Sequence, residues 1–178
     1  MNQGLPSGPR IVVGVDDSPA SRWALAWGIG EARLRRAPLL AVHVSRAPIT
    51  PIGEVLPYDH GASLEEEARS AELIASLFKD VAGGIPGDLH VVCVVQLGEP
   101  WRHLVELARP GDLLVLGRGR RHWWSRLFLP STRRCCTRYA RTTLVVVASP
   151  SAPDQPDLPA GHLGRRLRRP WMRHPPPP

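Results

Sequence analysis

The chain has 178 residues, of which 43% are hydrophobic, and a formal net charge of +7. This length suits one domain with a single core, and the hydrophobic share excludes a chain that is disordered throughout. No stretch approaches the roughly twenty apolar residues of a membrane helix, and the amino terminus lacks the apolar run of a secretory signal. We therefore expect a cytoplasmic protein that is not an integral membrane protein.

Positive charge is concentrated late in the chain. Residues 117–150 carry eight arginines and no acidic residue, and residues 151–178 carry five arginines and two aspartates. Residues 1–116 hold more acidic than basic side chains. An anionic partner is therefore expected near the end of the chain.

The three cysteines, Cys93, Cys135 and Cys136, lack the spacing of metal ligands. Neighbouring cysteines cannot form an unstrained disulfide with each other, so we expect reduced thiols. Cys135 and Cys136 are interpreted as small buried filler, although an arginine-rich first helical turn would lower a thiol pKa. No metal site is recognised.

The first predicted strand is Arg10–Val15, a β-branched run. Ser18 then supplies a helix cap and Pro19 suits the first helical position, so a helix is predicted to about Arg36. Apolar side chains at helical spacing predict that this helix covers a sheet. They are Trp23, Ala24, Trp27 and Leu34.

Residues Leu39–Val44 form a nearly continuous apolar run, typical of a parallel strand covered on both faces. His43 lies inside this run and is interpreted as a core histidine with satisfied hydrogen bonds, with a ligand-binding residue as the alternative. Ser63 is the predicted cap of a second helix, with Glu65, Glu66 and Glu67 in its first turn and Gly83 and Gly84 at its end. The later predicted elements are a strand at His90–Gln96, a helix at Glu99–Ala108, a strand at Asp112–Leu116, a helix at Ser131–Tyr139 and a strand at Thr142–Ala148.

This alternation predicts an α/β fold: a single doubly wound, five-stranded, mainly parallel sheet with helices on both faces. Residues 1–9 are predicted to be a flexible leader and residues 10–149 the folded domain. Residues 150–178, rich in proline and arginine, are predicted to be a disordered basic tail.

Ligands of open parallel sheets bind beyond the carboxyl ends of the strands, which selects Asp16, Val44 and Gly117. Gly117-Arg118-Gly119 follows the fourth predicted strand, and Ser131 begins the last helix. Backbone N–H groups there would attract an anion, which makes this a candidate phosphate cradle. A simple tight turn is the alternative interpretation.

Several segments resemble the universal stress protein family. The opening run IVVGVDDSPAS, Ile11–Ser21, is similar to the start of these proteins, and Leu40–Val44 is similar to their second strand. Gly98–Pro100, Asp112–Gly117 and Thr143–Val147 also match, so the resemblance extends from about Arg10 to Ser149. It implies an adenine-nucleotide alpha hydrolase-like fold, ATP or AMP as ligand, and a homodimer through the last strand, Thr143–Val147.

Members of that family that bind ATP carry a loop of the form Gly-x2-Gly-x9-Gly-[Ser/Thr]. In this chain the loop begins at Gly117, but Arg120 and Pro130 stand in place of the second and third glycines, before Ser131. Arg120 adds a Cβ atom and Pro130 lacks an N–H donor, so both changes should weaken a triphosphate contact. A frame in which Gly119 is the second glycine stays open, and the arginines nearby offer a remodelled site.

The resemblance implies that Asp16 faces the adenosine portion and that the backbone of Val44 faces the adenine. A solvated carboxylate in a turn is the alternative for Asp16. The full set of expected nucleotide-binding residues is Asp16, Val44, Leu116, Gly117, Gly119, Arg120, Ser131 and Thr132.

The leading functional hypothesis is a stress-response regulatory module that binds an adenine nucleotide weakly or in a modified way. The alternative is a nucleotide-independent interaction protein, whose arginine-rich loop around His122-Trp123-Trp124 and basic tail bind an acidic protein or nucleic acid. Contact of the tail with an acidic membrane surface is a further alternative. No catalytic constellation is recognised, so at most slow ATP hydrolysis is expected.

Overall fold

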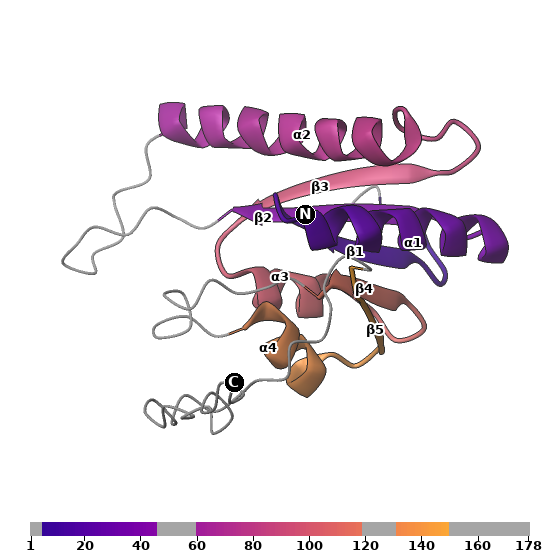
Figure 1. The fold of residues 1–178 in the computed structure, drawn as a ribbon. Coiled ribbons are helices and arrows are strands. Elements are labelled where there is room, and N and C mark those ends of the chain that lie inside the picture. The colour runs from indigo at the N-terminus through magenta and orange to yellow at the C-terminus, as the bar shows by residue number, and fades with distance from the viewer. Residues whose placement is uncertain (1–4, 46–59, 119–130, 150–178) are drawn as a thin grey trace, which may run out of the picture.

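The computed structural model describes residues 5–45, 60–118 and 131–149, which form one α/β unit (Figure 1). Its strands are β1 (Ile11–Val15), β2 (Leu39–Ser45), β3 (Val91–Leu97), β4 (Leu113–Gly117) and β5 (Thr143–Val147). Its helices are α1 (Pro19–Arg35), α2 (His60–Ala82), α3 (Pro100–Leu107) and α4 (Thr132–Tyr139). No helix in these ranges is long and apolar enough to cross a membrane.

The strand order β3-β2-β1-β4-β5 confirms the predicted doubly wound sheet, and all four strand pairings are parallel. Helices α1 and α2 cover one face of the sheet, and α3 and α4 cover the other (Figure 1). Alternate residues of β1 enter the two cores, so Val13 packs on the α1–α2 side and Val12 on the α3–α4 side. This double burial explains why the three inner strands β1, β2 and β4 are almost entirely apolar.

Local interactions define the two ends of α1, and the Ser18-Pro19 start is the signal that the sequence offered. The Ser18 hydroxyl accepts a hydrogen bond from the Ser21 N–H at 3.3 Å, and Pro19 takes the first helical position. Arg36 adopts a left-handed conformation with φ 52°, and its N–H bonds to the carbonyls of Ala32 and Arg33. Both predicted ends are therefore confirmed.

The predicted sheet-facing side of α1 is wrong apart from Ala24. Trp23 is 43% exposed, Trp27 is 36% exposed and Leu34 is 79% exposed. Small and aliphatic residues face the sheet instead, because α1 lies very close to β1: a Cβ atom on Gly28 would be 2.6 Å from Cγ2 of Val13. Tryptophan has no room on that side. The buried residues of α1 are Ala20, Ser21, Ala24, Leu25, Gly28, Ile29 and Ala32.

The start of α2 also differs from the prediction. The helix begins at His60, so Ser63 lies within it and Glu65, Glu66 and Glu67 lie beyond its first turn. A serine followed by glutamates favours a helix start, but it does not prevent the preceding residues from taking helical dihedrals. The predicted end is confirmed, because Gly83 has φ 75° and its N–H bonds to the carbonyl of Lys79 at 3.0 Å.

A buried ion pair closes the amino end of the sheet. Arg10, which precedes β1, is 1% exposed, and Asp112, which precedes β4, is 2% exposed. Nη2 of Arg10 lies 2.6 Å from Oδ2 of Asp112 and also donates to the carbonyl of Leu107 at 2.9 Å. Burial raises the pKa of Asp112, but hydrogen bonds from Arg10 and Arg109 outweigh it, so that pKa lies below its ordinary value.

The predicted leader and tail lie largely outside the described ranges. Residues 5–9 of the leader are described, and Leu5 packs against the core on the α3–α4 side. Residues 150–178 are not described, and neither is the loop that contains His122-Trp123-Trp124. Flexibility of the leader and disorder of the tail stay predictions.

Candidate functional site

A cleft of about 560 Å³ opens where β1, β2 and β4 end. The chain continues from β1 to β2 on one side, and β4 lies on the other side of β1, so the strand order reverses beside β1. This is the position at which doubly wound sheets bind ligands. Five of the predicted site residues line the cleft: Asp16, Val44, Leu116, Gly117 and Thr132.

The remaining predicted site residues are placed differently. Ser131 is the N-cap residue of α4, directly before the cleft-lining Thr132. Gly119 and Arg120 lie outside the described residues, as does Pro130. The structure therefore brings together the predicted nucleoside side of the site and the start of α4, and it does not test the glycine substitutions.

Asp16 is held by a compact set of hydrogen bonds at the turn into α1. Its Oδ1 atom accepts from the Ser21 hydroxyl at 2.5 Å and from the Ser18 N–H at 3.0 Å, while the Asp16 N–H donates to the Ser21 hydroxyl at 2.9 Å. Oδ2 has no hydrogen-bond partner within the described part of the chain. The exposed carboxylate thus offers one oriented oxygen that can accept from a hydroxyl donor of a ligand.

Gly117 lies at the cleft for a reason that the sequence did not reveal. A Cβ atom at this position would be 2.5 Å from the carbonyl oxygen of Ala20 and 2.6 Å from its carbonyl carbon. The first turn of α1 therefore touches the end of β4, and only glycine permits that approach. The requirement for glycine at position 117 comes from helix packing, whether or not a phosphate binds nearby.

The amino end of α4 supplies the positive side of the cleft. The Ser131 hydroxyl accepts from the Arg134 N–H at 3.5 Å, and Thr132 and Arg133 then line the cleft. Free N–H groups in the first turn and the helix dipole favour an anion there. Arg133 is exposed and forms no ion pair with any described residue. A phosphate group suits this end of the cleft.

Aliphatic side chains form the apolar wall of the cleft. Val42, Val44, Leu104 and Leu116 line it, and each is buried. Val42 is 1% exposed and Leu104 is 3% exposed. An apolar wall with a few convergent polar groups is the usual composition of a small-molecule site, and a flat aromatic base fits such a wall.

His43 is a cleft residue that the sequence analysis missed. It was interpreted as a core histidine with satisfied hydrogen bonds, and its Nδ1 atom does donate to the carbonyl of Val15 at 2.9 Å. The half-buried ring nevertheless lines the cleft, as do Ser45, Ser18 and Ser21. The available signal was position, because His43 lies two residues from the carboxyl end of β2.

The two neighbouring cysteines differ in burial, because Cys136 is buried and Cys135 is partly exposed. Cys136 is fully buried against Val12 and Leu104 in the α3–α4 core, which agrees with the interpretation as filler. Burial, followed by the charge of Cys135, raises the pKa of the Cys136 thiol to about 12. The suggestion of a lowered thiol pKa is therefore wrong for Cys136. Within the described ranges, no cluster of three or more His, Cys, Asp or Glu residues could hold a metal ion.

The fold and the cleft together define a class of protein: an α/β domain of the adenine-nucleotide alpha hydrolase-like fold. The profile of the universal stress protein family matches residues 9–148, and the chain belongs to this family.

Two comparisons with mycobacterial proteins agree with this assignment. A universal stress protein of Mycobacterium tuberculosis is 34% identical over 146 residues, which cover 77% of this chain and 46% of the relative. Another from the same species is 29% identical over 144 residues, which cover 80% of this chain and 48% of the relative. The chain thus spans about half the length of the curated relatives that it matches.

Solved structures show the same fold. The universal stress protein UspA from Lactobacillus plantarum superimposes with a TM-score of 0.57 at 20% identity, covering 80% of this chain and 99% of that one. A universal stress protein solved in complex with cAMP superimposes with a TM-score of 0.55 at 23% identity, covering 80% of this chain and 98% of that one.

Proposed function

We propose that this chain is a cytoplasmic stress-response regulatory module that binds an adenine nucleotide in the cleft at the ends of β1, β2 and β4. One observation carries the proposal: an apolar wall, an oriented carboxylate and the positive end of a helix line the same cleft. These three features match the base, the sugar and the phosphate of a nucleotide. The protein of similar fold solved with cAMP supports the same class of ligand.

Each of the three cleft features contacts one part of the nucleotide. The base lies against the apolar wall that includes Val44 and Leu116, and a ribose hydroxyl donates to Oδ2 of Asp16. The phosphate oxygens accept hydrogen bonds from backbone N–H groups at the start of α4 and form an ion pair with Arg133. Arg120 and Pro130 replace glycines that would serve a triphosphate, so we expect AMP to bind about as tightly as ATP.

Isothermal titration of the full chain with AMP and ATP tests this proposal. The informative variant is Arg133→Gln, which should weaken AMP binding by about tenfold because a charge-assisted contact is lost. The matched control is Arg138→Gln, which removes the same charge from the same helix at a position that does not line the cleft, and should leave AMP binding unchanged. Gly117→Asp is unsuitable, because it would collide with the backbone of Ala20.

The absence of heat up to millimolar AMP and ATP would overturn the proposal. The chain would then be assigned to the alternative, a nucleotide-independent interaction protein. Equal loss in Arg133→Gln and Arg138→Gln would show that the phosphate does not bind at the cleft end of α4.

We also propose that two copies pair through β5. The topology places β5 at the edge of the sheet, paired only with β4 among the described strands. Its side chains are apolar after Thr143, and Val146 is 39% exposed. An open apolar edge favours pairing with another chain. Light scattering should give a dimer at micromolar concentration, and Val146→Lys should shift it to a monomer, whereas a monomeric parent chain would refute the proposal.

A further inference from the structure

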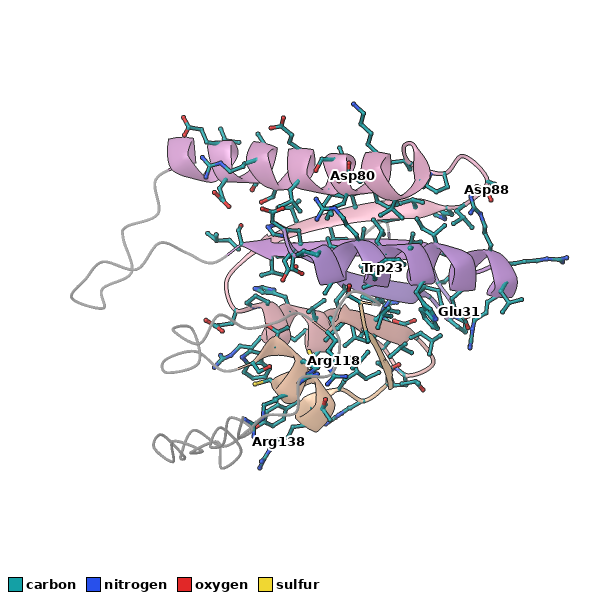
Figure 2. The ribbon with its side chains drawn as sticks, viewed as in Figure 1. Trp23, Glu31, Asp80, Asp88, Arg118 and Arg138 are labelled. Atoms are coloured by element: carbon teal, nitrogen blue, oxygen red, sulfur yellow. The ribbon has the colours of Figure 1, made fainter. Side chains whose placement is uncertain are left out.

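Arginines on the two sides of the sheet differ in how their charge is balanced. On the α1–α2 side, Arg22 pairs with Asp80 at 3.1 Å, Arg33 with Asp88 at 2.7 Å and Arg35 with Glu31 at 2.5 Å. Figure 2 shows these three acidic residues on that side of the molecule and Arg138 on the opposite side, on α4. The first side is therefore largely neutralised.

The other side carries an excess of positive charge. Residues 100–109 and 132–141, which contain α3 and α4, hold six arginines and one carboxylate, Glu106. None of these arginines forms an ion pair with a residue in the described ranges. Arg134 and Arg138 are one helical turn apart, where like charges destabilise a helix. The six are Arg102, Arg109, Arg133, Arg134, Arg138 and Arg141.

Two aromatic rings lie among these arginines. Trp101 of α3 and Tyr139 of α4 are stacked, with ring centroids 5.3 Å apart and an interplanar angle of 29°. The guanidinium of Arg102 lies 5.2 Å from the centre of the Trp101 ring, and that of Arg138 lies 5.7 Å from the centre of the Tyr139 ring. Tyr139 is 50% exposed. We call this the α3–α4 arginine surface, defined by Trp101, Arg102, Arg134, Arg138 and Tyr139.

We propose that the α3–α4 arginine surface binds single-stranded RNA without preference for sequence. Arginines contact the phosphates, and the exposed part of Tyr139 provides a surface on which a base stacks. An acidic peptide would use the same charges but gain nothing comparable from the aromatic ring. Arg134 and Arg138 do not line the nucleotide cleft, so this function does not depend on mononucleotide binding.

Fluorescence anisotropy of the full chain with a labelled oligouridine of about 15 nucleotides, over a range of salt concentrations, tests the proposal. The double variant Arg134→Gln/Arg138→Gln removes two phosphate contacts. It should lower the slope of log affinity against log salt by about 1.4 and weaken binding on the order of tenfold at about 0.1 M salt.

The matched control is Arg22→Gln/Arg33→Gln on the α1–α2 side. Both double variants lower the net charge from +7 to +5, so a general charge effect would change them equally. The control should keep the affinity and salt slope of the parent chain. An unchanged slope in Arg134→Gln/Arg138→Gln, or an equal loss in the control, would overturn the proposal and assign any RNA binding to other arginines of the chain.

A third variant distinguishes RNA binding from the binding of other polyanions. Tyr139→Leu should weaken oligouridine binding by about fivefold or more, because base stacking on an aromatic ring is lost. It should leave binding of a polyglutamate peptide of equal charge unchanged. If polyglutamate binds as tightly as oligouridine, and Tyr139→Leu affects neither, the surface binds acidic protein and the RNA proposal fails. Circular dichroism of each variant verifies folding, and unchanged AMP affinity of Arg134→Gln/Arg138→Gln keeps this test separate from that of the cleft.

Discussion

At the amino end of the sheet, Arg10 and Asp112 form an ion pair that is almost completely buried. At the carboxyl end, an aspartate and an arginine, Asp16 and Arg133, line one cleft, and no ion pair joins them in the described structure. The residue types are the same, but the first pair is shielded from water and the second is exposed. A buried pair satisfies its own charges, whereas exposed charges stay available to a ligand.

The comparison separates structural from functional charge within one domain. Removing one partner of a buried pair leaves an uncompensated charge in the interior, and the cost falls on folding. Removing an exposed cleft residue costs folding little, and the loss appears in ligand binding instead. Variants at the amino end of the sheet should therefore change the free energy of unfolding, and variants at the carboxyl end should change ligand affinity.

The largest effect on the free energy of unfolding is expected at the amino end of the sheet. Arg10→Ala should lower the free energy of unfolding by about 3–5 kcal/mol, because Asp112 is left buried without its cation. Urea denaturation measures the loss. The control is Arg22→Ala, which breaks an exposed pair with Asp80 and should cost no more than about 1 kcal/mol. Equal losses of unfolding free energy in the two variants would show that the buried Arg10–Asp112 pair stabilises the fold no more than an exposed pair does.

A smaller effect is expected at the carboxyl end of β4. Gly117→Ala should lower the free energy of unfolding by about 1–3 kcal/mol, because its Cβ atom forces α1 away from the sheet at Ala20. Gly30→Ala is the control: nothing lies within 4 Å of that Cβ position in α1, so it should stabilise the protein by up to about 1 kcal/mol. Full stability of Gly117→Ala, with loss of nucleotide binding, would instead support a direct phosphate role for Gly117.

Acid should remove the stabilising contribution of the Arg10–Asp112 pair at the amino end of the sheet. The pKa of Asp112 is lower in the folded protein than in the unfolded chain, so its contribution to stability is complete above the unfolded value and is lost as pH falls through the folded value. The slope for this one group is at most about 1.4 kcal/mol per pH unit. Urea denaturation between about pH 6 and pH 2 should show this component in the parent chain and not in Asp112→Asn.

Asp88 needs a control in that experiment. A hydrogen bond from Arg33 lowers the pKa of Asp88 as well, but this pair lies on the surface, where salt screens it. Repeating the pH series at high salt should remove the Asp88 component and keep that of Asp112. A pH dependence that disappears entirely with salt would contradict the buried origin assigned to it.

The smallest effect on stability is expected at Asp16. Asp16→Asn keeps a carbonyl oxygen that accepts from Ser21 and Ser18, so the free energy of unfolding should change by less than about 1 kcal/mol. AMP affinity should fall by several-fold, because the ribose loses a charged acceptor. Thermal unfolding and isothermal titration of the same preparation measure both. A large loss of stability with unchanged AMP affinity would make Asp16 a structural residue of the turn.

Much of the secondary structure could be predicted because its signals are local. Ser18 and Pro19 specify the start of α1, and Gly83 closes α2, because caps and left-handed residues act over a few neighbours. The α/β class followed from the alternation of apolar strands and amphipathic helices. The sheet-facing side of α1 could not be predicted in the same way, since tryptophans and small aliphatic residues both recur at helical spacing and only the distance to β1 excludes the larger ones.

The candidate site was predicted in outline and corrected in detail. Asp16, Val44 and Gly117 were selected by the rule that ligands bind at strand ends, and all three line the cleft. His43 was missed because its apolar neighbours suggested the core. The reason for Gly117 was missed because its contact is with Ala20, far away in the sequence.

The sequence by itself determined the class of fold, the family and the strand ends at which a ligand would bind, because periodicity, caps and short motifs are properties of neighbouring residues. Only the tertiary structure decided which charges are paired. Arg10 and Asp112 are 102 positions apart, and Trp101 meets Tyr139 only when α3 packs on α4. Pairing and burial depend on contacts between distant segments, and they separate an arginine that stabilises the fold from one that is free to bind.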